Sequence, residues 1–309
     1  ASGLTLMSWN VRNLFDDVRD GAEYREFDPD RGVWTAESFR LKVDAIGRVV
    51  RAAERGGPDV LFLQEIENAN ALETLVSRGL RGMGYRWKVF VPKTGCATNV
   101  AIVSRVPVRR VGTLAVTAWR GTEAVRDIVE ADLDGPAGGL VVFCVHWKAK
   151  TEGVRATEPS RREAAAALSA RVGEILDAVP AADVVVAGVF NECVDEHARI
   201  GRRYPTALMP EGSGDGALVV TARPGTWEAD GACVLYDPWL EQPRTPPGSY
   251  HYQGEWLSMD HILLSRGLFD RKGYGYRRGS FTTVPLPASR SGPVSDHLPV
   301  VLTLDPSRP

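Results

Sequence analysis

Polar side chains that can do chemistry follow apolar, strand-like runs at several separate places in the chain. These residues are Asn10, Glu65, His146, Asn191, Asp260 and the adjacent pair Asp296 and His297. In α/β sheets, binding and catalytic groups lie just past the carboxyl ends of strands, where each of these residues is expected. Taken singly, each has an ordinary interpretation as a hydrogen-bonded structural residue, a helix N-terminal acid or a turn. Repeated coincidences of one kind are much harder to explain in that way, so we interpret them as one site.

The residue types in this set favour phosphate chemistry assisted by a divalent metal. Carboxylate and amide oxygens form a hard-oxygen site, which suits Mg²⁺, with Mn²⁺ as a substitute. Zinc is disfavoured because the sequence has neither a closely spaced cysteine motif nor a dense histidine cluster. Histidines and amides together can hold a phosphate and transfer protons near neutral pH. The combination predicts hydrolysis of a phosphoester by an activated water.

The stretch 183–191 indicates how the chain positions such residues. It reads Asp-Val-Val-Val-Ala-Gly-Val-Phe-Asn, an acid followed by β-branched residues, which is typical of a strand buried on both faces. Further apolar strands are expected at 4–10, 59–66, 140–146, 257–264 and 298–304. Because each of these runs ends at or near a polar residue of the set, the strands are the elements that position the site.

Helices and shorter strands are expected between these runs. Thr35-Ala-Glu-Ser38 is a capping signal before a segment with one apolar helical face, made of Phe39, Val43, Ile46, Val49 and Val50. Further helices are expected at about 70–80 and at 159–178. Short strands separated by turns, at 86–91, 99–104, 111–116 and 127–133, indicate antiparallel pairing. Residues 195–255 are expected to be long functional loops around a few short elements.

This order of elements predicts an α/β fold. Two similar halves that each mix strands and helices would form two packed mixed sheets flanked by helices. No linker rich in Pro, Gly or Ser divides the chain, so we expect one domain over residues 1–309.

Composition indicates an ordinary globular protein, since 44% of its residues are hydrophobic and 25% are charged. A net charge of -2 argues against a strongly basic coat for nucleic acid, although a local basic groove is compatible with it. No apolar run approaches the length of a membrane span. We expect the protein to be a monomer. The first strand follows Ala1 closely, which leaves open the removal of a signal peptide. In an exported protein, Cys193 and Cys233 could form a disulfide.

Six short motifs, in this order, resemble those of the endonuclease/exonuclease/phosphatase superfamily, which includes deoxyribonuclease I. They are Ser8-Trp9-Asn10, Leu63-Gln64-Glu65, Val145-His146-Trp147, Gly188-Val189-Phe190-Asn191, Met259-Asp260-His261 and Ser295-Asp296-His297. The resemblance covers nearly the whole chain and implies a four-layer sandwich of two mixed, mainly antiparallel β-sheets flanked by helices. Asn13-Leu-Phe-Asp16 and residues 158–166 are similar to the bacterial, often exported branch, which favours export.

The resemblance implies a metal and phosphate site. Asn10 and Glu65 would hold Mg²⁺, with Glu65 as the main ligand and Asp296 near the metal. His146 and Asn191 would bind the scissile phosphate.

The resemblance also implies the acid/base group. His297, oriented by Asp260, would be the acid/base or phosphate-stabilising histidine. Arg126, Lys148 and Arg162 are weaker candidates for phosphate contacts, because each has an ordinary interpretation as a solvated charge.

One position departs from the superfamily pattern. Where that pattern reads Gly-Asp-x-Asn, this chain has Gly188-Val189-Phe190-Asn191, and the missing Asp is the residue usually assigned to activating or positioning the attacking water. Val is close to Asp in volume and well suited to a strand, so we expect the fold to tolerate it. We expect impaired chemistry, since a positioned base contributes about 10²–10⁴-fold.

Several functions remain open at this point. The leading hypothesis is a Mg²⁺-dependent phosphodiesterase acting on nucleic acid, with DNA as the substrate, in a form of low activity. A second hypothesis is a phosphate- or nucleic-acid-binding protein without turnover. A third is a hydrolase of small or lipid phosphoesters in the same fold. The inositol-phosphatase branch is disfavoured because the strand at 257–264 lacks a Trp-Cys-Asp-Arg signature.

Overall fold

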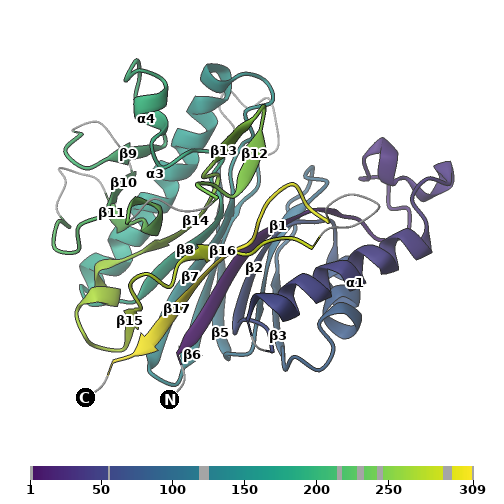
Figure 1. Ribbon diagram of the computed structural model, residues 1–309, viewed down its shortest axis with the longest axis horizontal. Helices are drawn as coiled ribbons and strands as arrows, with labels where there is room; N and C mark the ends of the chain where they lie inside the picture. The colour runs from purple at the N-terminus through teal and green to yellow at the C-terminus, as the bar shows by residue number, and fades with distance from the viewer. Residues whose placement is uncertain are drawn as a thin grey trace.

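Two β-sheets packed face to face form the centre of the molecule, and a long helix covers the outer face of each (Figure 1). The computed structural model describes residues 3–54, 56–117, 125–213, 218–227, 233–241, 246–287 and 294–307. Over these residues the layers follow the order α1 (Ala36–Ala53), first sheet, second sheet and α3 (Val154–Ala178). The predicted α/β sandwich of two mixed sheets flanked by helices is therefore confirmed.

The first sheet has the strand order β15-β17-β1-β2-β4-β3, with β16 paired to β17. Its strands are β1 (Leu4–Leu14), β2 (Val60–Ile66), β3 (Trp87–Phe90), β4 (Asn99–Ser104), β15 (Tyr274–Tyr276), β16 (Thr282–Thr283) and β17 (Val300–Pro306). β1 and β2 run parallel, whereas the other pairs are antiparallel. Because β1 and β2 are parallel, Asn10 lies opposite Gln64 and close to Glu65, near the carboxyl ends of the two strands.

The second sheet has the order β5-β6-β7-β8-β14-β11-β10-β9. Its strands are β5 (Val108–Leu114), β6 (Ile128–Gly135), β7 (Gly138–His146), β8 (Val184–Val189), β9 (Leu208–Pro210), β10 (Leu218–Thr221), β11 (Cys233–Tyr236) and β14 (Asp260–Leu264). β8 lies between β7, to which it is parallel, and β14, to which it is antiparallel. This arrangement puts the end of β8 between the end of β7 and the start of β14.

The alternation of side chains along each central strand produces the layers. In β1, Leu6 packs between the two sheets, whereas Met7 packs toward α1. In β8, Val185 packs between the sheets, whereas Val184 packs toward α3. All four side chains are fully buried, and each contributes about 1.5–3 kcal/mol of hydrophobic stabilisation. The sandwich is thus held by three apolar layers, and its strand ends are left to carry polar groups.

Helix α1 forms as the sequence predicts. The Thr35 hydroxyl accepts a hydrogen bond from the Ser38 backbone N–H (3.1 Å) and caps the helix. The predicted apolar face, which includes Phe39, Val43 and Ile46, is buried against the first sheet. The helix therefore covers that sheet on the side away from the second sheet.

Several boundaries differ from the sequence prediction. Residues 195–255 contain the short elements that were expected, and three of them, β9, β10 and β11, extend the second sheet as mostly parallel strands. Their few residues and irregular spacing hide the strand pattern. The helix expected at 70–80 is α2 (Ala69–Thr74) followed by a single π turn (Leu75–Gly79). Helix α3 begins at Val154, earlier than predicted, and holds Pro159 inside it.

The proposed disulfide between Cys193 and Cys233 is not formed. Both cysteines are free and buried, with Cys233 on β11 and Cys193 in the loop after β8. Burial raises the pKa of each thiol to about 12. Among the described residues, no helix is both long and apolar enough to cross a bilayer.

Candidate active site

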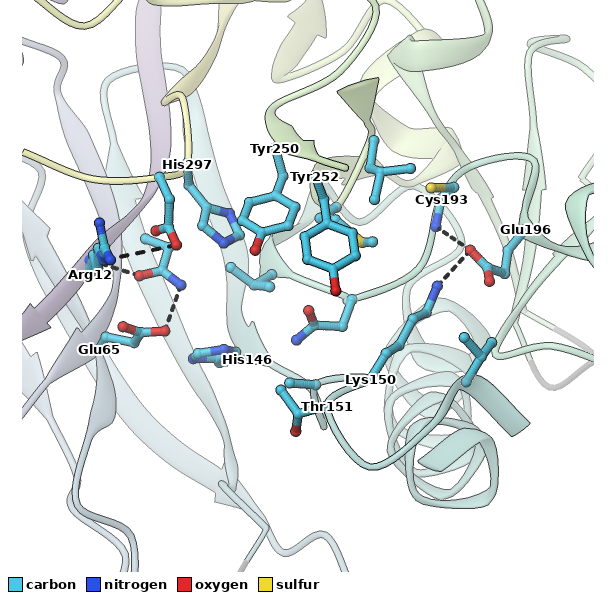
Figure 2. Close-up of a pocket in the computed structure, with 18 of the residues that line it drawn as sticks. Arg12, Glu65, His146, Lys150, Thr151, Cys193, Glu196, Tyr250, Tyr252 and His297 are labelled. Atoms are coloured by element: carbon cyan, nitrogen blue, oxygen red, sulfur yellow. Dashed lines mark hydrogen bonds and ion pairs between the residues drawn. The ribbon is translucent and has the colours of Figure 1, made fainter. Parts of the chain in front are cut away.

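A cleft of about 740 Å³ opens at the strand ends where the two sheets meet. Its lining includes most residues predicted for the site: Asn10, Glu65, His146, Val189, Asn191, Asp296 and His297. In Figure 2, Glu65 and His297 stand at one end of the cleft, and Lys150 and Glu196 at the other. Tyr250 and Tyr252 project between these ends.

Asn10 and Glu65 form the first pair of the site. The Asn10 amide donates to Glu65 Oε1 (2.8 Å), and the backbone N–H of Asn13 donates to Glu65 Oε2 (2.8 Å). The Asn10 oxygen accepts the backbone N–H of Arg12 (2.8 Å). The Glu65 carboxylate is thus bound by neutral N–H donors, while the Arg12 guanidinium faces Asp296 at 3.8 Å.

Backbone strain is concentrated at this site. Arg12, Asn13, Glu65 and Asn191 all have positive φ, from 52° to 65°, and all line the cleft. Such conformations are unfavourable for residues other than glycine, and they persist where the surrounding structure enforces them. The pairing register shifts beside Glu65 and between Asn10 and Leu14, so the strain accompanies bulges at both strand ends. These bulges turn the polar side chains toward the cleft.

His297 is held by Asp260. Its Nδ1 lies 2.8 Å from Asp260 Oδ2, and the Ser249 hydroxyl donates to the same oxygen (2.5 Å). The Tyr250 ring lies on the imidazole, with ring centroids 4.6 Å apart. Burial alone would lower the pKa of His297, but the carboxylate of Asp260 outweighs it and raises that pKa. Asp260 is therefore in a position to orient the His297 ring.

The Asp296–His297 segment is tied to β1. The Ser295 hydroxyl donates to the Asn10 carbonyl (2.7 Å) and accepts from the His297 N–H (3.0 Å). The Trp9 indole donates to the His297 carbonyl (2.9 Å). These contacts bring the end of the chain to the metal-ligand candidates near its start.

His146, at the end of β7, is buried, and its Nδ1 has no hydrogen-bond partner among the described residues. Burial, followed by the positive charges of Arg126 and His297, holds the pKa of His146 well below its usual value. The imidazole is therefore neutral and carries one N–H, which can be donated to an oxygen of a ligand. Arg126 itself binds Thr98 through its carbonyl (2.8 Å) and its hydroxyl (2.9 Å). The positive charge of Arg126 therefore acts on His146, although the guanidinium is hydrogen-bonded to Thr98.

Val189 lies at the centre of the site. Its neighbours across the sheet are His146 on β7 and Asp260 on β14. The preceding Gly188 has a φ of 148°, and a Cβ there would lie 2.0 Å from the Val145 carbonyl. Only glycine permits this close approach of β8 to β7. Asn191 then turns back, and its amide donates to the Trp147 carbonyl (2.9 Å).

Two predicted phosphate contacts lie elsewhere. Arg162 is exposed on α3 and does not line the cleft. Lys148 pairs with Glu152 at 2.6 Å and is also absent from the lining. Neither is brought to the other site residues.

The neighbouring Arg161 has a structural role that the sequence did not reveal. It is fully buried and pairs with Glu192 (2.7 Å) and Glu158 (2.7 Å). It also donates to the carbonyls of Lys148 and Val154, at 3.1 Å each. This network holds the first turn of α3 against the loop after Asn191, and it explains why the helix begins before Pro159. Glu192 faces away from the cleft, as the alternation of side chains predicts.

Further cleft residues were missed by the sequence analysis. Lys150, paired with Glu196 (2.6 Å), forms the far wall. Tyr250 and Tyr252 come from β12 (Tyr250–Tyr252), which pairs with β13 (Glu255–Leu257), and their rings stack at 6.2 Å. The aromatic content of 195–255 was a signal for this hairpin, but its position over the cleft depends on the tertiary fold.

The donor set fits a hard divalent cation. Glu65, Asn10 and Asp296 offer carboxylate and amide oxygens at one end of the cleft, and Asp296 is part-exposed. Mg²⁺ prefers one or two carboxylates and otherwise keeps water or phosphate ligands, which such an open site allows. Within the described part of the cleft, the only cysteine is Cys193, at the far end, so the donor set does not favour zinc.

The two-sheet sandwich and the polar cleft at its strand ends define a phosphoesterase of the deoxyribonuclease I-like fold. Residues 5–199 match the Endonuclease/Exonuclease/phosphatase family, and the chain belongs to this family. Comparison with curated proteins found no match.

Solved structures share the fold at low sequence identity. Truncated TDP2 of Caenorhabditis elegans is 17% identical, with a TM-score of 0.60 over 98% of this chain and 97% of that one. TDP2 of D. rerio, complexed with a single strand DNA product, is 17% identical, with a TM-score of 0.57 over 99% and 100%. Beta toxin of Staphylococcus aureus is 16% identical, with a TM-score of 0.56 over 97% and 99%.

Proposed function

We propose that this protein is a divalent-metal-dependent phosphodiester hydrolase that acts on DNA, and that Val189 keeps its turnover low. The observation that carries the proposal is the meeting of two groups in one cleft. Glu65 and Asn10 supply metal ligands, and His146 and His297 supply phosphate and proton-transfer groups. Each group alone is common in proteins, but together they match phosphoester chemistry.

The metal ligands in this proposal are Glu65, Asn10 and Asp296, with Mg²⁺ as the cofactor and Mn²⁺ as a substitute. A bound Mg²⁺ supplies Lewis-acid polarisation of a phosphoryl oxygen. Glu65 is the main ligand because its carboxylate has no cationic partner among the described contacts. Asn10 orients that carboxylate through its amide.

The remaining groups bind phosphate and move a proton. Neutral His146 and the Asn191 amide receive the scissile phosphate, since neither needs a charge to hydrogen-bond an oxygen. His297, held by Asp260, is the acid/base or phosphate-stabilising group. With Val189 at the position of the family's Asp, β8 supplies no carboxylate that could position an attacking water between these groups.

DNA is the first substrate to test for two reasons. A protein of the same fold, D. rerio TDP2, has been solved with a single strand DNA product. The stacked rings of Tyr250 and Tyr252 beside the cleft are surfaces on which bases can stack. Binding without turnover is the second candidate, and Val189 is the observation that favours it.

The deciding experiment is cleavage of supercoiled plasmid and single-stranded oligonucleotide with Mg²⁺, with Mn²⁺ and with EDTA. A phosphomonoester and a lipid phosphodiester are run in parallel. Metal-dependent nicking that disappears in Glu65→Gln supports the hydrolase. DNA binding that persists in EDTA without any cleavage supports the binding protein. Turnover of the lipid diester or the monoester alone contradicts the choice of DNA.

A further inference from the structure

A second group of carboxylates lies outside the cleft, where the loop after β1 meets the end of β2. Asp16, Asp20 and Glu23 come from the loop, and Glu67 follows β2 directly. One carboxylate oxygen from each of Asp20, Glu23 and Glu67 lies within 4.8 Å of the other two. None of these residues lines the catalytic cleft.

Glu67 is the unusual member of this group. It is 4% exposed, and its Oε2 accepts the Asp16 backbone N–H (2.7 Å) and the Asn68 amide (3.2 Å). Its Oε1 is buried and has no hydrogen-bond partner in the part of the chain that the structure describes. Native proteins rarely leave a buried carboxylate oxygen without a partner, because its lost hydration is costly.

The charges around Glu67 are also uncompensated. Asp16 is 2% exposed, and its oxygens accept the Val18 N–H (2.7 Å) and the amides of Asn68 (3.0 Å) and Asn70 (2.8 Å). Asp20 and Glu23 accept backbone N–H groups of their own loop. In the described part of the chain, no Lys, Arg or His forms an ion pair with these four carboxylates. Neutral donors satisfy hydrogen bonds, but they supply no positive charge to this group of carboxylates.

We propose that Asp20, Glu23 and Glu67 bind a structural Ca²⁺ ion that is distinct from the metal of the cleft. Carboxylates from a loop, without His or Cys, are the ligands of a hard cation. Oxygens that lie within 4.8 Å of one another can all be ligands of one Ca²⁺ ion, because Ca²⁺–oxygen distances are about 2.3–2.6 Å. Mg²⁺ fits an irregular loop less well, because it bonds oxygen at about 2.0–2.1 Å and requires near-octahedral geometry.

The ion would order a wall beside the cleft. The loop already packs through Phe27, whose ring stacks on Phe15 at 4.6 Å. The Trp34 indole donates to the Asp16 carbonyl (2.7 Å). Phe27 and Trp34 share a smaller cavity with Asn13, which binds Glu65. Fixing the loop to Glu67 thus supports the backbone that holds the main catalytic metal ligand.

The test is calorimetric titration of the metal-free protein with CaCl₂, using wild type, Asp20→Asn/Glu23→Gln and the control Glu26→Gln/Asp30→Asn. The control neutralises two exposed carboxylates of the same loop outside the group. We expect wild type and control to bind one more Ca²⁺ ion than the Asp20/Glu23 variant. At about 100 times Kd, Ca²⁺ should raise the unfolding midpoint by about 4 °C in wild type and control alone.

Two further variants complete the design. Glu65→Gln should keep this Ca²⁺ ion while it loses metal at the cleft, which separates the two sites. Glu67→Gln should lose the ion. If that buried change prevents folding, the Asp20→Asn/Glu23→Gln variant, whose residues are not buried, keeps the test valid. Equal Ca²⁺ stoichiometry and equal midpoint shifts in wild type and the Asp20/Glu23 variant would overturn the proposal.

Discussion

Replacing Val189 with Asp should raise phosphodiester hydrolysis by at least about 10²-fold. Val189 is 1% exposed and stands between His146 and Asp260 on the neighbouring strands. Residues directly opposite one another on adjacent strands point to the same face of a sheet. The new carboxylate would therefore face the same space as these two residues, where the carboxylate of Asp260 is already engaged by Ser249 and His297.

The magnitude follows from the worth of one positioned base. A gain of about 10²–10⁴-fold corresponds to about 2.7–5.4 kcal/mol of activation free energy. Against this stands a stability cost of about 1–3 kcal/mol for placing a carboxylate at a buried position. The cost is limited because Asp and Val are close in volume and His297 lies near Asp260. Substrate and metal affinity should change much less, because their contacts are already assembled.

The assay is the initial cleavage rate of a labelled DNA duplex by wild type and Val189→Asp at matched Mg²⁺. Val189→Asn is the control, because it has the shape of Asp without its basicity. A higher cleavage rate in Val189→Asp but not in Val189→Asn identifies a general base. Equal rates in wild type and Val189→Asp would refute the reasoning, and an equal gain in Asn would assign the effect to polarity alone.

Three further changes test other parts of the structure. Glu65→Gln should abolish most Mg²⁺ binding in calorimetry while the fold, followed by circular dichroism, is unchanged; unaltered affinity would remove Glu65 as the main ligand. Arg161→Met should lower the free energy of unfolding in urea by about 3–5 kcal/mol, because it strands the buried carboxylates of Glu158 and Glu192. A loss below about 1 kcal/mol would contradict this. Burial raises the pKa of Asp183 from 3.8 to about 7, so the folded state keeps a proton that the unfolded chain releases. Wild-type stability should therefore fall from pH 4 to pH 7, by up to about 4 kcal/mol, relative to Asp183→Asn. Parallel stability curves for the two proteins would contradict this assignment.

Much of the candidate site could be predicted because its groups follow strands. Asn10, Glu65 and His146 each end an apolar run, and this pattern is visible without any tertiary information. The pairing of Asp260 with His297 was inferred from resemblance, and its geometry depends on contacts between residues 37 positions apart. Strand ends are local signals, whereas such contacts are not.

The errors have a common physical origin. On helix α3, the adjacent residues Arg161 and Arg162 have different environments: Arg161 is buried and has a structural role, whereas Arg162 is exposed to solvent. That assignment required the helix to start at Val154, whereas Pro159 favoured a later start. Likewise, Tyr252 lies over the cleft through the β12–β13 pairing, which no local pattern in a loop-like stretch specifies. Sequence reasoning failed where burial depends on how distant elements pack.

Several of the predicted site residues cost the fold stability. Asp260 holds two loops together through its bonds to Ser249 and His297, and it also buries an Oδ1 that has no hydrogen-bond partner among the described residues. Glu65 and His146 cost stability as well: Glu65 has a φ of 65°, and His146 buries an Nδ1 without a partner among the described residues. None of these costs is recovered in the described contacts, and such features are expected where a ligand completes the site. Val189, by contrast, is apolar, buried and suited to its strand. The departure from the family pattern is therefore at the position where a change favours the fold, while the residues that burden the fold remain, and this is why one substitution is expected to restore turnover.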